Sequence, residues 1–169
     1  MTAALTGPTT NCITSFLTEI GIVLTWANLP DETFLPGIQV FDGTLLVDES
    51  KLKYPGDLLH EAGHLAVVPA DARPHLNDEV TWPDQNADLI EAAAICWSYA
   101  ACVHLGLDPQ IVFHKDGYLG RSEGLLLNFQ MQVYPGAVAL EAAGMTYTVN
   151  NAEKLGFEPF PAMRKWLRD

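Results

Sequence analysis

The sequence has few cysteines and few basic residues, and each shortage excludes a class of protein. Only 3 of the 169 residues are cysteine, and Cys12, Cys96 and Cys102 form no Cys-x-x-Cys pair. They are expected to be reduced core residues of a cytoplasmic protein rather than part of a disulfide scaffold. The 9 Lys and Arg residues stand against 21 Asp and Glu residues, a net charge of −12. Without a basic run to neutralise phosphates, neither nucleic acid nor an anionic membrane surface is an expected partner.

Long uninterrupted apolar runs, internal repeats and low-complexity segments are also missing. The apolar stretch 13–26 contains Glu19 and follows no basic residue, so it is expected to be neither a signal peptide nor a membrane span. With 49% apolar and 18% charged residues, the composition is that of an ordinary globular protein. The length predicts a single domain, 1–169, with a substantial hydrophobic core.

The most informative stretch is the apolar segment 58–68, which contains His60-Glu61-Ala62-Gly63-His64. On a helix, residues four apart lie on one face, so the two histidines can bind one zinc ion. Glu61 then lies beside the metal rather than on it, in the position of a general base for a water molecule that the metal activates. Unpartnered histidines would be costly on so buried a helix. The motif therefore predicts a zinc site.

A second apolar helix, expected to begin near Asn86 and to end at Gly106, supplies a third ligand. Glu91 is the charged residue of its apolar part, 89–103. A buried carboxylate needs a cation, a donor network or a proton, and zinc held by the other helix meets that need. Two histidines and Glu91 would leave one position of a tetrahedral site open, as in catalytic zinc sites. The alternative third ligands are Asp88, His104 and His75.

The remaining segments predict a mostly helical α+β fold. Apolar periodicity predicts a first helix over 11–27, and Asp42-Gly43 between β-prone residues predicts a hairpin within 38–47. Its edge strand could bind an extended peptide by adding it to the sheet. Further helices are expected over 122–132 and 136–143. The alanines beside Glu91, with Ala62 and Gly63 opposite, predict that the two central helices approach closely.

Two loops are expected to border the site. The long loop over 70–85 is predicted to form its rim. The glycine-rich loop 114–120 carries His114 and Tyr118, either of which could stabilise an oxyanion during catalysis. Histidines and tyrosines are also common in surface turns, so both assignments stay open.

With these features, residues 9–106 resemble the small His-Glu-x-x-His metallopeptidases of the gluzincin type, in particular the ImmA/IrrE-like group. The shared features are a leading helix, a hairpin turned at Asp42-Gly43, the motif helix, and a later helix in which Glu91 precedes alanines and Trp97. The resemblance implies a zincin-like domain in which a small sheet packs on the motif helix. The residues after the third helix have no recognisable counterpart in that group.

The resemblance also implies an activity. It assigns zinc binding to His60, His64 and Glu91 and the role of base to Glu61, so the chain is expected to hydrolyse peptide bonds of a peptide or protein substrate. Two alternatives stay open: a non-proteolytic binding or regulatory module that keeps the zincin-like fold, and a zinc hydrolase that acts on a non-peptide bond. The intact Glu61 favours an enzyme, because a purely structural site needs no base beside its ligands.

Overall fold

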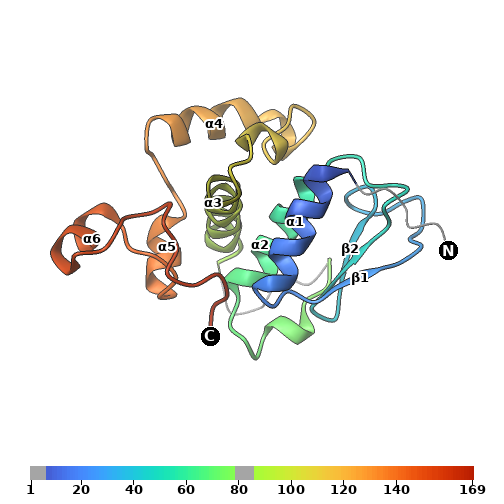
Figure 1. The fold of residues 1–169 in the computed structure, drawn as a ribbon, viewed down its shortest axis with the longest axis horizontal. Helices are drawn as coiled ribbons and strands as arrows, with labels where there is room; N and C mark the ends of the chain where they lie inside the picture. The colour runs from blue at the N-terminus through green and yellow to red at the C-terminus, as the bar shows by residue number, and fades with distance from the viewer. Residues whose placement is uncertain (1–6, 79–85) are drawn as a thin grey trace.

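The computed structural model describes residues 7–78 and 86–169, which form a mostly helical α+β fold (Figure 1). Within these residues there are six α-helices and one three-stranded sheet with both parallel and antiparallel neighbours. The predicted fold class is therefore confirmed.

The N-terminal apolar segment forms a helix followed by a strand, so the single helix predicted over 11–27 is wrong. Helix α1 spans Pro8–Glu19 and strand β1 spans Leu24–Trp26. Gly21 follows the helix with φ of 95°, a left-handed value that favours glycine. Apolar periodicity continues past this glycine, but residues 24–26 pair with a neighbouring strand instead, which periodicity cannot reveal.

The predicted hairpin forms the rest of the sheet. Strands β2 (Ile38–Phe41) and β3 (Thr44–Val47) are antiparallel, and β1 pairs in parallel with β3, in the order β1–β3–β2. Asp42 and Gly43 turn the hairpin with φ values of 44° and 70°, the positive pair of a type I′ turn. The predicted turn is therefore confirmed. It could be predicted because the residue types of the turn themselves favour positive φ.

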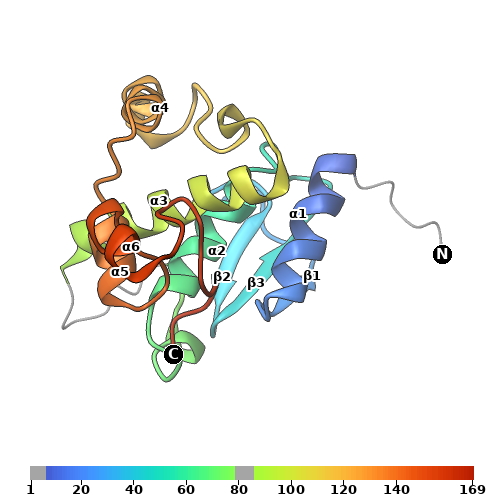
Figure 2. The same cartoon turned by 60° about the vertical axis from the view of Figure 1, so that its left-hand side comes forward.

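Two central helices carry the candidate site. Helix α2 spans Asp57–Val67 and helix α3 spans Ala87–Leu105. The Asn86 side chain caps α3 by accepting a hydrogen bond from the N–H of Asp88, and Gly106 ends it in the left-handed conformation, as predicted. Figure 2 shows β2 and β3 lying against α2, with α1 beside β1.

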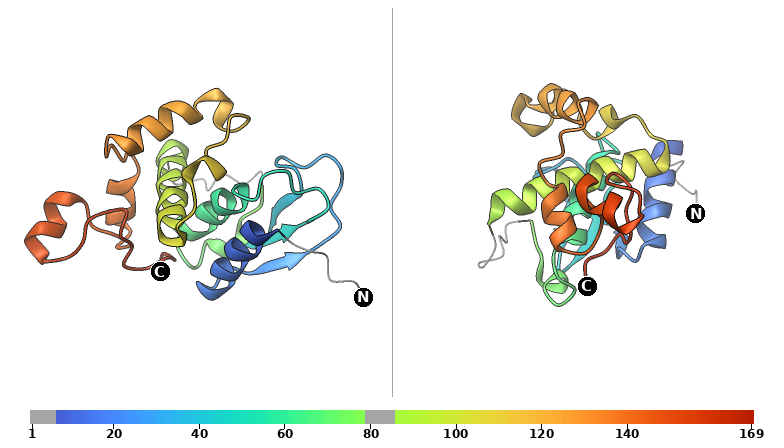
Figure 3. Two further views of the ribbon diagram at one scale, coloured as in Figure 1. Left: turned by 45° about the horizontal axis from the view of Figure 1, so that its top comes forward. Right: turned by 90° about the vertical axis from the view of Figure 1, so that its left-hand side faces the viewer.

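Helix α3 is long and apolar enough to cross a membrane, judged by length and composition alone. It lies in the middle of the molecule (Figure 3), and Trp97, Ala94 and Ala101 on it are fully buried. Core helices meet the same length and composition criteria, and the contacts of α3 are those of a core helix. The prediction of a buried central helix is confirmed for the middle of α3 only: Leu89 and Val103 are exposed, and the Glu91 side chain, expected to be buried, is 44% exposed.

Three shorter helices follow on the side of α3 away from the sheet: α4 (Ser122–Gln130), α5 (Ala137–Ala142) and α6 (Val149–Leu155). The predicted helices over 122–132 and 136–143 are confirmed, with ends shifted by one or two residues. The connections contain the short 3₁₀ helices η1 (Arg73–His75), η2 (Pro109–Ile111) and η3 (Tyr118–Gly120).

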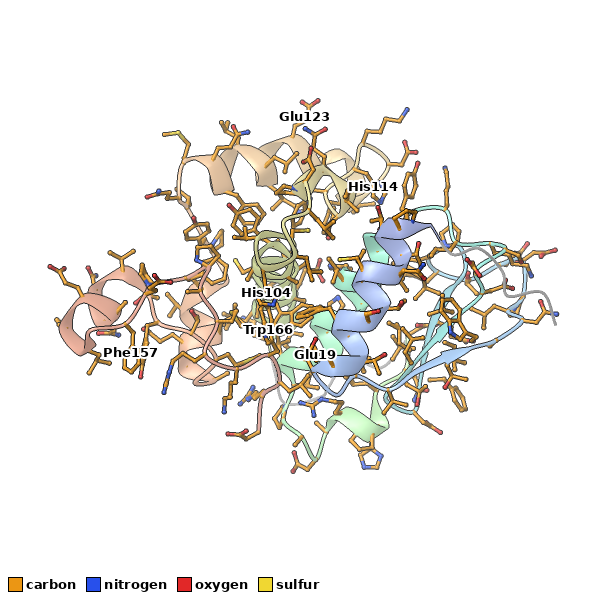
Figure 4. All side chains as sticks on the ribbon, viewed as in Figure 1. Glu19, His104, His114, Glu123, Phe157 and Trp166 are labelled. Carbon is orange, nitrogen blue, oxygen red and sulfur yellow. The ribbon has the colours of Figure 1, made fainter. Side chains whose placement is uncertain are left out.

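The C-terminal tail returns to the core and packs against α1 and α3. Trp97 donates a hydrogen bond from Nε1 to the carbonyl oxygen of Trp166 at 2.9 Å. The Trp166 ring meets the rings of Phe16 and Trp97 edge-on, with centroids 5.0 and 5.6 Å away. His104 lies against Trp166 in the same cluster (Figure 4). The tail thus belongs to the core, which no pattern in the sequence indicates.

Candidate metal site

Helix α2 places two histidine rings side by side. His60 and His64 are one turn apart and project from the same face. Their Nε2 atoms lie 3.1 Å apart, and their rings meet at 84°. The side chains are 14% and 30% exposed, so both are largely shielded from water. Two ring nitrogens this close need a proton or a cation between them, since two lone pairs repel.

The close approach of α2 and α3 brings Glu91 to these nitrogens. A Cβ carbon on Gly63 would lie 2.9 Å from the Ala94 carbonyl oxygen, so only glycine lets the backbones come this near. Glu91, nearly one turn before Ala94, has Oε2 3.2 Å from Nε2 of His64 and Oε1 3.8 Å from Nε2 of His60. The predicted close contact between the helices is confirmed.

The two histidines and Glu91 form a group that could hold a metal ion. One ligand atom from each lies within 4.8 Å of the others. With metal–ligand bonds of about 2.0–2.2 Å, ligand atoms of a tetrahedral zinc site lie roughly 3.3–3.5 Å apart. The two Nε2 atoms are 3.1 Å apart, slightly less than this, and Glu91 approaches them with two different oxygens, Oε2 at 3.2 Å from His64 and Oε1 at 3.8 Å from His60. Imidazole and carboxylate suit zinc, and also other divalent transition metals.

Burial and mutual contacts set the protonation of these residues. Burial, followed by the charge of His64, lowers the pKa of His60 to about 4. Burial also acts to lower the pKa of His64, but the hydrogen bond with Glu91 and the charges of Glu61 and Glu91 together raise it. The same hydrogen bond lowers the pKa of Glu91 against the effect of burial. Without a metal, His64 therefore carries a proton that is shared with Glu91. A bound metal ion would displace this proton.

Glu61 lies beside this group without belonging to it. Burial raises the pKa of its carboxyl to about 7, and the surrounding carboxylates act in the same direction while His64 opposes them. A carboxyl group with a pKa near neutrality can both accept and return a proton. Glu61 thus has the chemistry that the sequence analysis expects of a base.

A cleft of about 930 Å³ opens over these residues. The side chains of His60, Glu61, His64 and Glu91 all line it. Phe34 and Leu119 line it as well. Phe34 is 84% exposed and Leu119 is 92% exposed, so the cleft has apolar side chains at its solvent-facing border. A volume of this size admits a small molecule or a short extended peptide.

His114 and Tyr118 both line this cleft and both contact α2. Nε2 of His114 lies 2.9 Å from Oδ1 of Asp57, and its ring stacks on Tyr54 with centroids 3.7 Å apart. Nδ1 of His114 is buried without a hydrogen-bond partner in the described parts of the chain, so the ring proton belongs on Nε2, where it donates to Asp57. The Tyr118 hydroxyl lies 3.1 Å from Nδ1 of His60.

Asp57 and Tyr54, the partners of His114, were not predicted from the sequence. Asp57 lies in the first turn of α2, where an acidic residue is common for the sake of the helix dipole, so nothing marked it as part of a site. Tyr54 lies in no recognisable motif. An oxyanion role for His114 or Tyr118 stays a prediction.

The alternative third ligands lie apart from the two histidines. His104 is exposed, packs against Phe16 and Trp166, and is not part of the metal-binding group found among the described residues. His75 belongs to η1, outside the lining of the cleft. Asp88 lines the cleft, yet the metal-binding group found among residues 7–78 and 86–169 does not include it. The structure therefore places Glu91 with the histidines.

The outer edge of β2 is engaged by the segment that follows η1. The N–H of Val40 donates to Oδ1 of Asp78 at 2.6 Å, and the N–H of Asp78 donates to the carbonyl oxygen of Val40 at 3.2 Å. Asn77 accepts a hydrogen bond from the N–H of Asp42 at 3.0 Å. Residues 76–78 also line the cleft, as expected of a rim, whereas 79–85 of the predicted rim lie outside the described residues. An extended peptide can pair with Val40 only after these bonds open.

Comparison with known proteins adds no relative. No model of a protein family matches this chain, and no curated protein or solved structure matches it. What is established is a group of two histidines and a glutamate, on two packed helices, that could hold a metal ion.

Proposed function

We propose that this protein is a zinc-dependent peptidase with a zincin-like site, in which His60, His64 and Glu91 hold the metal and Glu61 is the general base. The observation that carries the proposal is the place of Glu61. It lies on the same cleft as the three ligand residues, with a pKa raised by burial to about 7. A site that only stabilised the fold would have no use for such a carboxyl group next to its ligands.

A divalent ion held by these residues would polarise a substrate carbonyl and lower the pKa of a water molecule toward about 7. Glu61 accepts a proton from that water while the water oxygen attacks the carbonyl carbon of the substrate. Glu61 then delivers the proton to the peptide nitrogen, the carbon–nitrogen bond breaks, and a carboxylic acid and an amine leave, after which the acid loses its remaining proton to solvent. Without a metal, burial raises the pKa of Glu61 to about 7; a divalent ion beside it would lower this pKa and favour the carboxylate that accepts the proton.

The charges around the cleft favour a peptide with basic side chains over an acidic one. Most charged side chains of the lining are acidic, namely Asp57, Glu61, Asp78, Asp88, Glu91 and Asp116, against Lys53 and Arg121. A divalent ion would offset only part of this charge. Cationic peptides are therefore the substrate class to test first.

The occupied edge of β2 favours the second candidate, a binding module without proteolysis. Asp78 is hydrogen-bonded to the N–H and to the carbonyl oxygen of Val40, the two backbone groups with which a substrate peptide would have to pair. In that case the protein would bind zinc and a partner peptide but leave the peptide intact.

The first test is the metal content of the purified protein, measured by elemental analysis beside a His60→Ala/His64→Ala variant and a His75→Ala control. We expect about one zinc per chain in the wild type and the control, and none in the double variant. A folded wild type that takes up no zinc even when it is supplied would overturn the proposal.

The second test uses Glu61→Gln, which keeps the size of the side chain and removes its basic group. This variant should bind zinc like the wild type and lose cleavage of a mixture of basic peptides, followed by mass spectrometry. Equal cleavage by both proteins would contradict the mechanism, and zinc binding without cleavage by the wild type would favour the binding module.

A further inference from the structure

His60 has a second polar contact, on the side of its ring away from the candidate metal site. The Tyr118 hydroxyl lies 3.1 Å from Nδ1, and the two rings meet at 80° with centroids 5.2 Å apart. Nε2 of the same ring faces His64 and Glu91. The two nitrogens of His60 therefore have different partners, and a proton can reside on only one of them while the other offers a lone pair to a metal.

We propose that Tyr118 is a positioning residue: its hydroxyl oxygen accepts a hydrogen bond from Nδ1–H of His60 and so directs the Nε2 lone pair toward His64 and Glu91. The inference rests on the proposed metal site, and it gives Tyr118 a role that acts through His60. Outer partners of this kind fix the tautomer and the ring orientation of a histidine ligand.

The backbone around Tyr118 is held in a conformation that its own residues do not favour. Tyr118 and Leu119 have left-handed φ values of 53° and 54°, which residues other than glycine disfavour. Leu119 is 92% exposed, so burial of its side chain does not compensate for the strain. What this conformation achieves is the placement of the Tyr118 ring edge-on to His60.

One contact ties the loop that carries Tyr118 to α2, and a second contact closes the loop on itself. Before it, His114 pairs with Asp57, three residues ahead of His60 on the same helix. After it, the Ser122 hydroxyl donates to the carbonyl oxygens of His114 and Gly117 at 2.6 and 3.2 Å. The loop is thus anchored to the helix that carries the histidines, so the Tyr118 hydroxyl and His60 keep their relative positions.

The decisive variant is Tyr118→Phe, which keeps the ring and removes the hydroxyl. Zinc affinity is measured by competition with a chromophoric chelator, with Tyr147→Phe as the matched control, because the Tyr147 ring stacks on Phe157 outside the cleft. We expect Tyr118→Phe to bind zinc about 10–100-fold more weakly and the control to be unchanged. Unchanged affinity with reduced turnover would overturn the inference and assign Tyr118 to the oxyanion instead.

A spectroscopic measurement separates this inference from the proposed function. Long-range ¹H–¹⁵N NMR of the histidine side chains reports which nitrogen of His60 carries the proton. We expect Nδ1–H in the wild type, with or without zinc, and faster exchange of that proton with water in Tyr118→Phe. A proton on Nε2 in the metal-free protein would overturn the inference. If the wild type binds no zinc, the proposed function fails. The NMR spectrum of the metal-free protein still decides whether Tyr118 selects the tautomer of His60.

Discussion

Gly63 and Ala94 touch where α2 and α3 pack together: a Cβ carbon on Gly63 would lie 2.9 Å from the carbonyl oxygen of Ala94 and 3.3 Å from its Cα. Both of these atoms belong to the backbone, so no side-chain rotation can relieve the contact. His64 follows Gly63 directly, and Glu91 lies nearly one turn before Ala94. The spacing of the two helices therefore sets the distance between His64 and Glu91.

Replacing Gly63 with alanine should disturb both stability and metal binding. We expect Gly63→Ala to lower the free energy of unfolding by about 1–3 kcal/mol, the usual cost of overpacking, and to weaken zinc binding because the helices must separate. Urea unfolding and a chelator competition measure the two effects. Gly124 in α4 is the matched control, since nothing lies within 4 Å of a Cβ carbon added there. Gly124→Ala should stabilise the helix by about 0.5–1 kcal/mol, and similar behaviour of the two variants would show that the α2–α3 contact is not tight.

Zinc binding should release about one proton near pH 6, and that proton should come from His64. Burial acts to lower the pKa of His64, but Glu91 and Glu61 together raise it, whereas the pKa of His60 is lowered to about 4. A histidine ligand must be unprotonated, so affinity should fall about tenfold per pH unit below the pKa of His64, and more steeply only near that of His60. Calorimetric titration in buffers of different ionisation enthalpy counts the protons. The count is made in Glu61→Gln, because the Glu61 carboxyl, with a pKa of about 7, would release a proton of its own beside a bound cation. Release of two protons near pH 6 by that variant would contradict this assignment.

Removing the Asp78 carboxylate should free one of the two backbone groups of Val40 at the edge of β2, its N–H, while the backbone N–H of residue 78 still donates to the Val40 carbonyl oxygen. Oδ1 of Asp78 accepts the N–H of Val40, which would otherwise be free to pair with a peptide carbonyl. In a Glu61→Gln background we expect Asp78→Ala to bind an uncharged peptide several-fold more tightly, as for one hydrogen bond of about 1 kcal/mol. Fluorescence anisotropy measures the affinity. Asp71→Ala removes the same charge outside the cleft lining and should change nothing, and weaker binding in Asp78→Ala would exclude this edge as the peptide site.

Truncating Trp166 should show that the C-terminal tail is part of the core. The ring contacts Phe16, Trp97 and His104, so Trp166→Ala should cost about 3 kcal/mol of unfolding free energy. Phe34→Ala is the matched aromatic control, because Phe34 is 84% exposed and its loss should change stability by less than about 0.5 kcal/mol. Thermal unfolding of both variants makes the comparison. Equal melting temperatures would mean that the tail does not contribute to the core.

The parts of the fold that the sequence predicted are those with local chemical signals. Asn86 and Gly106 mark the ends of α3 through capping, and Asp42-Gly43 marks the hairpin through its positive φ values. The predicted first helix is too long because apolar periodicity continues beyond Gly21, and only pairing with β3 makes 24–26 a strand. A short apolar run has no internal feature that distinguishes these outcomes.

By itself, the sequence determined which residues can share a metal on one helix, because the spacing of His60 and His64 is a property of the helix alone. Only the tertiary structure decided which carboxylate joins them, since the position of Glu91 depends on the contact of Gly63 with Ala94. The partner of His60 at Nδ1 was decided in the same way, by a loop that follows α3. Contacts between segments distant along the chain depend on packing, which leaves no periodic pattern in the sequence.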